Sequence, residues 1–106
     1  MRAIKIKIVS FISNDQPGFV ECSFFDAWKK EHRVQEKIPV VTEKDLDENS
    51  DYPQDGIIAC EIIKIWTDKY NRKLYTVSTE KPWDIETLEG LNEFDLLEEQ
   101  LIEIKR

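Results

Sequence analysis

The stretch that most constrains the fold is residues 56–67, with the sequence GIIACEIIKIWT. Eight of the ten residues from Ile57 to Trp66 are apolar, and five of those eight are isoleucine. Isoleucine is branched at Cβ, which suits an extended backbone better than a helix. Pro53 precedes the stretch and a turn-forming segment, residues 70–72, follows it. We therefore predict that this stretch is the longest and most buried strand.

Alternation assigns the apolar side chains of this strand to two faces. A sheet with one solvated face alternates apolar and polar residues, and this strand does not. Both faces are therefore expected to need cover, one from the core and one from a second layer, the C-terminal segment or another chain. The two predicted sets are Ile57, Ala59, Ile63 and Ile65, interrupted by Glu61, and Ile58, Cys60, Ile62 and Trp66, interrupted by Lys64.

Other segments show the two-residue period of half-buried strands. These segments are residues 2–12, 19–25, 32–38 and 73–79. Between them, residues 41–46 are compatible with one short helical turn capped by Thr42. The segment from Phe94 to Ile104 fits either a helix or two short strands, and we favour two strands joined by a turn at residues 98–100.

These segments together predict the fold class. We expect an all-β protein, either a small antiparallel barrel or a compact β-sandwich of six to seven strands, with at most short helical turns. A chain of 106 residues has the size of one domain, so residues 1–106 are expected to form a single β domain.

Composition limits the compartment and the chemistry. Nothing approaches the roughly 18-residue apolar run of a membrane helix, and Lys5 and Lys7 interrupt any signal-peptide core. We therefore expect a cytoplasmic protein without membrane contact. Cys22 and Cys60 have no metal-ligand spacing and are expected to be buried thiols rather than a disulfide.

No motif in the sequence indicates catalysis or a cofactor. His32 is the single histidine, lies among basic residues, and is expected at the surface. Residues 45–51 begin like a calcium loop, but Ser50 and Gly56 occupy positions that need glycine and glutamate. We therefore predict a protein that is not an enzyme and that binds neither a metal nor a cofactor.

Charge is distributed unevenly along the chain. The net charge is −7, which disfavours nucleic acid and favours a basic partner. Residues 43–55 contain six acidic side chains and one lysine. This loop is either a solvated surface or a mimic of a nucleic-acid backbone that docks on a basic cleft. Its candidate partner-binding residues are Asp45, Asp47, Glu48, Asp51, Tyr52 and Asp55.

Two predicted turns provide an alternative site. Small β-barrels bind single strands with aromatic platforms and basic rims. One turn places Lys29, Lys30 and Arg33 near Trp28, and the other brings basic residues close to Tyr70. The alternative nucleic-acid-binding residues are Lys69, Arg72 and Lys73.

Several short segments carry a resemblance to other proteins. They are residues 17–21, 26–28, 36–41, 52–53 with 56–61, 79–83 and 94–101. Over most of its length the chain resembles a group of short, uncharacterised bacterial β-rich proteins, which implies no functional residues. In size and acidity it is similar to immunity proteins of bacterial toxin systems.

The sequence leads to one functional expectation and one alternative. We expect a non-enzymatic, acidic protein-binding module, in one form an immunity-type inhibitor of a basic toxin or nuclease. The alternative is a small β-barrel that binds RNA or the translation apparatus through its basic hairpin turns. The partner's identity and the oligomeric state stay open at this point.

Overall fold

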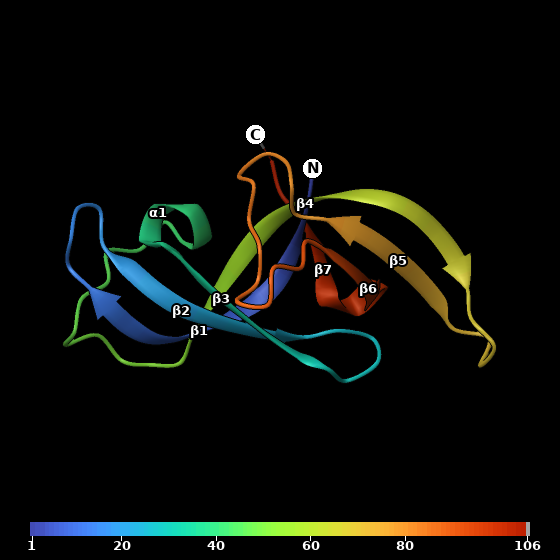
Figure 1. Ribbon diagram of the computed structural model, residues 1–106, viewed down its shortest axis with the longest axis horizontal. Coiled ribbons are helices and arrows are strands. Elements are labelled where there is room, and N and C mark those ends of the chain that lie inside the picture. Colours follow the sequence, from blue (N-terminus) through green and yellow to red (C-terminus); the bar gives the residue numbers. More distant parts are fainter. Residues whose placement is uncertain (106) are drawn as a thin grey trace.

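The computed structural model describes residues 1–105, and Figure 1 shows that a strongly curled sheet makes up most of it. The helical elements are α1 (Ile38–Val41) and the 3-10 turn η1 (Glu98–Gln100). Sheet therefore dominates the chain, as predicted. The strands are β1 (Arg2–Ser13), β2 (Phe19–Phe25), β3 (Glu31–Lys37), β4 (Gln54–Thr67), β5 (Lys73–Ser78), β6 (Glu93–Leu97) and β7 (Leu101–Glu103).

The strands pair antiparallel in the order β3-β2-β1-β4-β5-β6, and β7 pairs with β1. β1 is central because β4 pairs along one of its edges, whereas β2 and β7 share the other edge. Since β7 returns to β1, the sheet curls into a half-barrel. The prediction of an all-β antiparallel fold with six to seven strands is confirmed.

The core follows from the alternation in β1. Ile4, Ile6 and Ile8 are buried, whereas Lys5 and Lys7 on the opposite face are exposed. Burial of one such side chain contributes about 1.5–3 kcal/mol, so this stripe alone fixes which face of β1 turns inward. The same cluster takes side chains from the other strands, α1 and the loop before β6: Val20, Cys22, Phe24, Val34, Ile38, Val41, Ile58, Cys60, Tyr75, Val77, Ile85, Phe94, Leu96 and Leu101.

A β-bulge interrupts the alternation of β4. Ile62 pairs with Val77, but the next pair is Lys64 with Thr76, so Ile63 is an extra residue without a partner in β5. One extra residue moves every later side chain of a strand to the opposite face. The prediction of two continuous faces is therefore wrong beyond Ile62.

The bulge exchanges the faces of the last part of β4. Ile65 pairs with the buried Tyr75 on the core side, whereas Trp66 lies on the opposite side. The sequence analysis predicts Trp66 on the same face as Ile58, Cys60 and Ile62, and the bulge makes that prediction wrong for Trp66. Ile63 and Ile65 are 51% and 52% exposed. β4 is the longest strand, as predicted, but the prediction that it is the most buried is wrong, because only Ile58, Ala59 and Cys60 of its 14 residues are buried.

The helical turn lies earlier in the chain than predicted. The expected helix began after Thr42, but α1 ends there, and the Thr42 amide donates to the Ile38 carbonyl at 3.1 Å. Pro39 explains the shift, because a proline fits the first turn of a helix, where its missing N–H is not needed. Ile38 and Val41 are both buried, so the turn is also held by packing.

The C-terminal segment confirms the strand–turn–strand prediction. β6 pairs with β5, η1 turns the chain, and β7 pairs with β1. Phe94, Leu96 and Leu101 from this segment are buried in the core. The segment therefore closes the half-barrel rather than lying on it as a helix.

The molecule is elongated, with extents of 44 × 27 × 23 Å. In Figure 1 the loop between α1 and β4 lies at one end of the long axis, and the β4–β5 turn lies at the other. The β2–β3 turn reaches toward the same end as the β4–β5 turn. The two candidate sites of the sequence are thus separated along the longest dimension.

Candidate functional site

The last two residues of the predicted acidic loop, 54 and 55, belong to β4, and the rest of it, residues 42–53 and here called the acidic loop, is held by hydrogen bonds of its own. The Asn49 amide donates to Asp47 Oδ1 at 2.8 Å, and the Asp47 amide donates to Ser50 Oγ at 3.0 Å. The Tyr52 hydroxyl donates to the Asp47 carbonyl at 2.8 Å. Because these bonds fix both the middle and the end of the loop, its backbone is defined rather than only solvated.

The predicted partner-binding residues fall into two groups. Asp47 and Tyr52 hold the loop, and Tyr52 also packs against the core. Asp55 lies in β4 and forms an ion pair with Lys7, which holds the pKa of Asp55 below its usual range. The other three predicted residues, Asp45, Glu48 and Asp51, are exposed and form no ion pair within residues 1–105, as is also true of the neighbouring Glu43.

The β2–β3 turn is built around Asp26. Its Oδ1 accepts the Trp28 amide at 2.8 Å and the Lys30 amide at 3.0 Å. The Asp26 amide donates to the Lys30 carbonyl, and Lys29 adopts a positive φ of 66°. This arrangement leaves Trp28 at the tip of the turn, 46% exposed.

The β4–β5 turn repeats this arrangement around Asp68. Its Oδ1 accepts the Tyr70 and Arg72 amides, both at 2.9 Å. The Asp68 amide donates to the Arg72 carbonyl, and Asn71 has a φ of 63°. Burial alone would raise the pKa of Asp68, but hydrogen bonds from Arg72 and the Tyr70 amide outweigh it and hold that pKa below its usual range.

Arg72 joins the two turns, which we call the paired turns (residues 26–30 and 68–72). Its Nε donates to Asp68 Oδ2 at 2.9 Å, and its NH1 group donates to the Ala27 carbonyl at 3.2 Å. The guanidinium carbon lies 5.1 Å from the centre of the Trp28 ring and 5.7 Å from that of Tyr70. A cation between two aromatic faces holds both rings in place.

His32 supports the paired turns from beneath. Its Nε2 lies 2.8 Å from Asp26 Oδ2, and its ring lies 5.2 Å from Phe24 and 4.8 Å from Phe94 between ring centres. His32 is only 4% exposed, so the predicted surface position is wrong. Alternation in β3 places His32 on the same face as Val34, which outweighs the charged neighbours in the sequence.

A polar chain connects Trp28 to the outer face of the sheet. The Trp28 indole donates to Asp95 Oδ2 at 3.1 Å, and the Thr76 hydroxyl donates to Asp95 Oδ1 at 2.6 Å. The Trp66 indole in turn donates to the Thr76 hydroxyl at 2.9 Å. This chain exists because the bulge in β4 turns Trp66 to the face that Trp28 covers.

The predicted basic residues do not act as one group. Lys69 and Arg72 lie on the β4–β5 turn, but the Arg72 guanidinium already donates hydrogen bonds to Asp68 and to the Ala27 carbonyl. Lys73 lies 5.4 Å from the Tyr75 ring centre on the core side of β5, and a hydrogen bond with Tyr75 raises its pKa. Lys69 instead lies beside its own turn's aromatic residue, with its Nζ 5.2 Å from the centre of the Tyr70 ring.

Sequence reasoning missed that the two turns are equivalent. The signal was a five-residue pattern that occurs twice, as DAWKK at 26–30 and DKYNR at 68–72. In both, aspartate comes first, an aromatic residue third and a basic residue fifth. An aspartate that accepts two downstream amides is a known turn former. The aromatic residue then occupies the same position at both tips.

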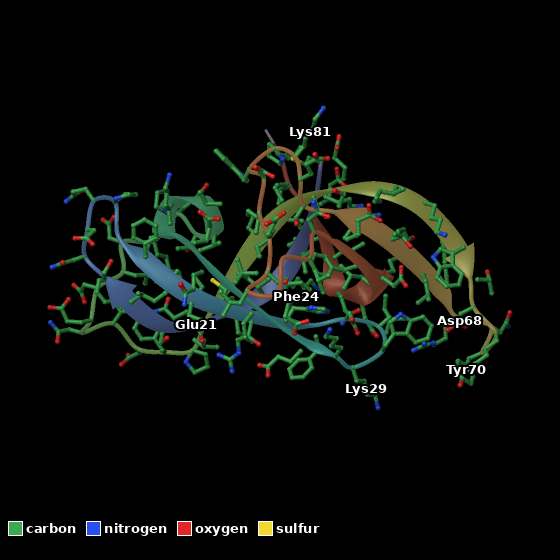
Figure 2. The ribbon with its side chains drawn as sticks, viewed as in Figure 1. Glu21, Phe24, Lys29, Asp68, Tyr70 and Lys81 are labelled. Carbon is green, nitrogen blue, oxygen red and sulfur yellow. The ribbon has the colours of Figure 1, made fainter. Side chains whose placement is uncertain are left out.

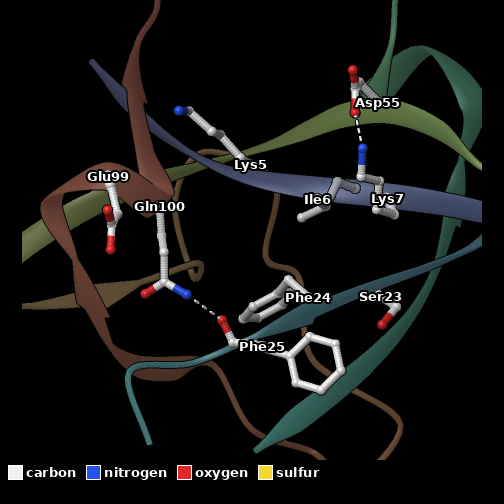
Figure 3. Close-up of a pocket in the computed structure, with 9 residues that line it drawn as sticks. All are labelled: Lys5, Ile6, Lys7, Ser23, Phe24, Phe25, Asp55, Glu99 and Gln100. Atoms are coloured by element: carbon white, nitrogen blue, oxygen red, sulfur yellow. Dashed lines mark hydrogen bonds and ion pairs between the residues drawn. The ribbon is translucent and has the colours of Figure 1, made fainter. Parts of the chain in front are cut away.

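Figure 3 shows an open hollow of about 360 Å³ on the outer face of β1 and β2. Gln100 donates to the Phe25 carbonyl at 2.8 Å across one side, and Lys7 pairs with Asp55 at the other. A second groove of about 840 Å³ runs between α1, the start of β4 and residue 104, and Trp83 lines it. Small-molecule sites need several polar groups that converge, and in the first hollow most such groups already bind one another.

Three further findings concern the chain as a whole. Within residues 1–105, no three histidine, cysteine, aspartate or glutamate side chains lie close enough together to hold a metal ion. In the same part of the chain, no helix has both the length and the apolar character that a membrane crossing requires. The chain matches no protein-family model, no curated protein and no solved structure.

Proposed function

We propose that the protein is a non-enzymatic binding module that docks a basic partner protein on its acidic loop. One observation carries this proposal. The loop backbone is fixed by bonds through Asp47 and Tyr52, while Asp45, Glu48 and Asp51 remain exposed. An immunity-type inhibitor that covers the basic cleft of a toxin or nuclease is the form of this function that we favour.

The physical argument is preorganisation of like charges. A loop that is already ordered loses little conformational entropy when it binds. Carboxylates held close together repel one another in the free protein, and a basic surface relieves that repulsion. Charge pairs of this kind raise the association rate more than the lifetime of a complex, and salt screens them. The proposal therefore predicts an association rate that falls steeply as salt concentration rises.

The experiment reverses the free loop charges without removing the bonds that hold the loop. The variant carries Asp45→Lys, Glu48→Lys and Asp51→Lys, and leaves Asp47 intact because its side chain accepts the Asn49 amide. The partner is recovered by co-purification from the native cell, and association is followed by surface plasmon resonance. We expect the association rate to fall at least about tenfold at low salt.

A matched variant separates the loop from net charge. Glu80, Glu86 and Glu93 are exposed and form no ion pair within residues 1–105, so reversing them to lysine changes the net charge by the same amount. This variant is expected to bind as the parent does. Equal losses in both triple variants would show that net charge alone matters, and the loop would then not be the docking site.

A further inference from the structure

The paired turns present two exposed aromatic rings from a rigid base. Tyr70 is 64% exposed and Trp28 is 46% exposed, and both rings lie against the Arg72 guanidinium. Asp26 and Asp68 fix the two backbones beneath them through the same pattern of hydrogen bonds. The rings are therefore preorganised platforms rather than mobile side chains at loop tips.

Each ring has a free lysine beside it. Lys29 follows Trp28 directly, is exposed, and forms no ion pair within the part of the chain that the structure describes. Lys69 precedes Tyr70, and its Nζ lies 5.2 Å from the centre of the Tyr70 ring. Figure 2 shows Lys29, Asp68 and Tyr70 at the same end of the molecule.

We propose that the paired turns bind single-stranded nucleic acid, independently of the acidic loop. Bases stack on Trp28 and Tyr70, and the backbone phosphates lie near Lys29 and Lys69. Exposed aromatic platforms next to cationic side chains are the combination that proteins use for single strands. Unpaired bases are required, because the bases of a duplex are already stacked on one another.

Arg72 has a positioning role in this site. Its donors bind Asp68 and the Ala27 carbonyl, so the guanidinium spaces the two rings and ties the hairpins together. Lys73, on the core side of β5 beside Tyr75, lies outside the site. Of the three basic residues that the sequence suggested, only Lys69 therefore contacts the ligand, and Lys29 of the other turn joins it.

The net negative charge of the protein does not oppose this site. The acidic loop lies at the opposite end of a molecule 44 Å long. At about 0.1 M salt, charges separated by more than about 10 Å are largely screened. The electrostatic surroundings of a bound strand are thus set by the groups of the paired turns and by Asp95 beside them, among which Lys29 and Lys69 are exposed cations, rather than by the loop.

The test uses a fluorescein-labelled oligouridine of about ten nucleotides, long enough to span such a site. Binding is measured by fluorescence anisotropy at about 50 mM and about 200 mM salt. The parent is expected to bind the single strand, with tryptophan fluorescence quenched on binding and with affinity falling as salt rises.

Tyr70→Ala is expected to weaken binding about tenfold, because one stacked base is lost. The double variant Lys29→Glu and Lys69→Glu is expected to weaken binding and flatten its salt dependence.

Matched controls keep the result specific. Trp83→Ala removes a ring that is 44% exposed and lines the groove beside α1, away from the paired turns, and Lys5→Glu with Lys81→Glu makes the same change in net charge as the lysine variant. Both controls are expected to bind as the parent does, and thermal unfolding checks that every variant is folded. The proposal is overturned if the parent does not bind the strand at about 50 mM salt, if the controls lose as much affinity as the test variants, or if a duplex of equal length binds as tightly.

Discussion

Two aspartates perform the same task in the paired turns with different second partners. In both, Oδ1 accepts two backbone amides of the turn. Oδ2 of Asp26 faces the His32 ring, whereas Oδ2 of Asp68 accepts the Arg72 guanidinium. The second partner therefore determines how well each position tolerates an uncharged amide.

Asparagine substitutions separate these two cases. Asp26→Asn keeps an oxygen for the turn and places its NH₂ group toward His32, whose neutral ring can accept a hydrogen bond. We expect a loss of about 1 kcal/mol in the free energy of unfolding. Asp68→Asn sets an amide donor against the Nε–H donor of Arg72, so its melting temperature is expected to fall further. Thermal unfolding followed by circular dichroism checks this order, and equal melting temperatures would contradict it.

At the scale of elements, the bulge in β4 shows where prediction from sequence ends. The segment contains two polar residues, Glu61 and Lys64, which would fall on opposite faces of a regular strand, although both are exposed on the outer face. This spacing indicates that the alternation reverses between them, but the apolar residues around it do not say at which residue. The extra residue, Ile63, is defined only by its absence of a partner in β5. The C-terminal strand–turn–strand could be predicted because Glu98, Glu99 and Gln100 separate two short apolar runs.

The second half of β4 also has an unpaired edge. β1 begins its pairing with β4 at Arg2 and Cys60, so residues 61–67 of β4 pair only with β5 within the described chain. Exposed edges that carry apolar side chains invite pairing with another molecule. If two copies paired antiparallel over these seven residues, Lys64 of one copy would face Lys64 of the other, and like charges opposite each other are destabilising.

Removing this lysine is expected to permit self-association. Lys64→Val should produce dimers or larger assemblies that increase with concentration, seen by sedimentation velocity. Lys7→Val is the matched control, because Lys7 lies inside the sheet, between β2 and β4. A monomeric Lys64→Val variant would mean that the bulge alone protects this edge.

At the scale of the molecule, the length of β4 separates the two candidate sites. A strand rises about 3.3 Å per residue, so the 14 residues of β4 follow an arched path of about 46 Å, and the acidic loop extends beyond its start (Figure 1). The acidic loop precedes β4 and the second of the paired turns follows it, which places them at opposite ends (Figure 1). The charged segments and the long strand between them could be predicted from the sequence, and the separation of the two candidate sites follows from that order.

The meeting of the paired turns could not be predicted in the same way. The β2–β3 and β4–β5 hairpins are distant in sequence, and only the curl of the sheet brings Trp28 against Arg72. A third turn, residues 87–91, has similar backbone bonds with the Thr87 hydroxyl in place of the carboxylate and Glu89 at the aromatic position. All three turns thus share the backbone geometry, and only the paired turns have an aromatic residue at the third position.

The two thiols test whether this curled sheet opens as one unit. Cys22 in β2 and Cys60 in β4 are both buried and free. Burial raises the pKa of Cys22 to about 12 and that of Cys60 to about 11, so at about pH 8 the folded protein offers almost no thiolate to an alkylating reagent. Reaction must then pass through opening of the sheet. We expect both cysteines to be alkylated slowly and at the same rate, measured by mass spectrometry of peptides after an iodoacetamide pulse. Faster labelling of Cys60 alone would show that the β4–β5–β6 part opens separately.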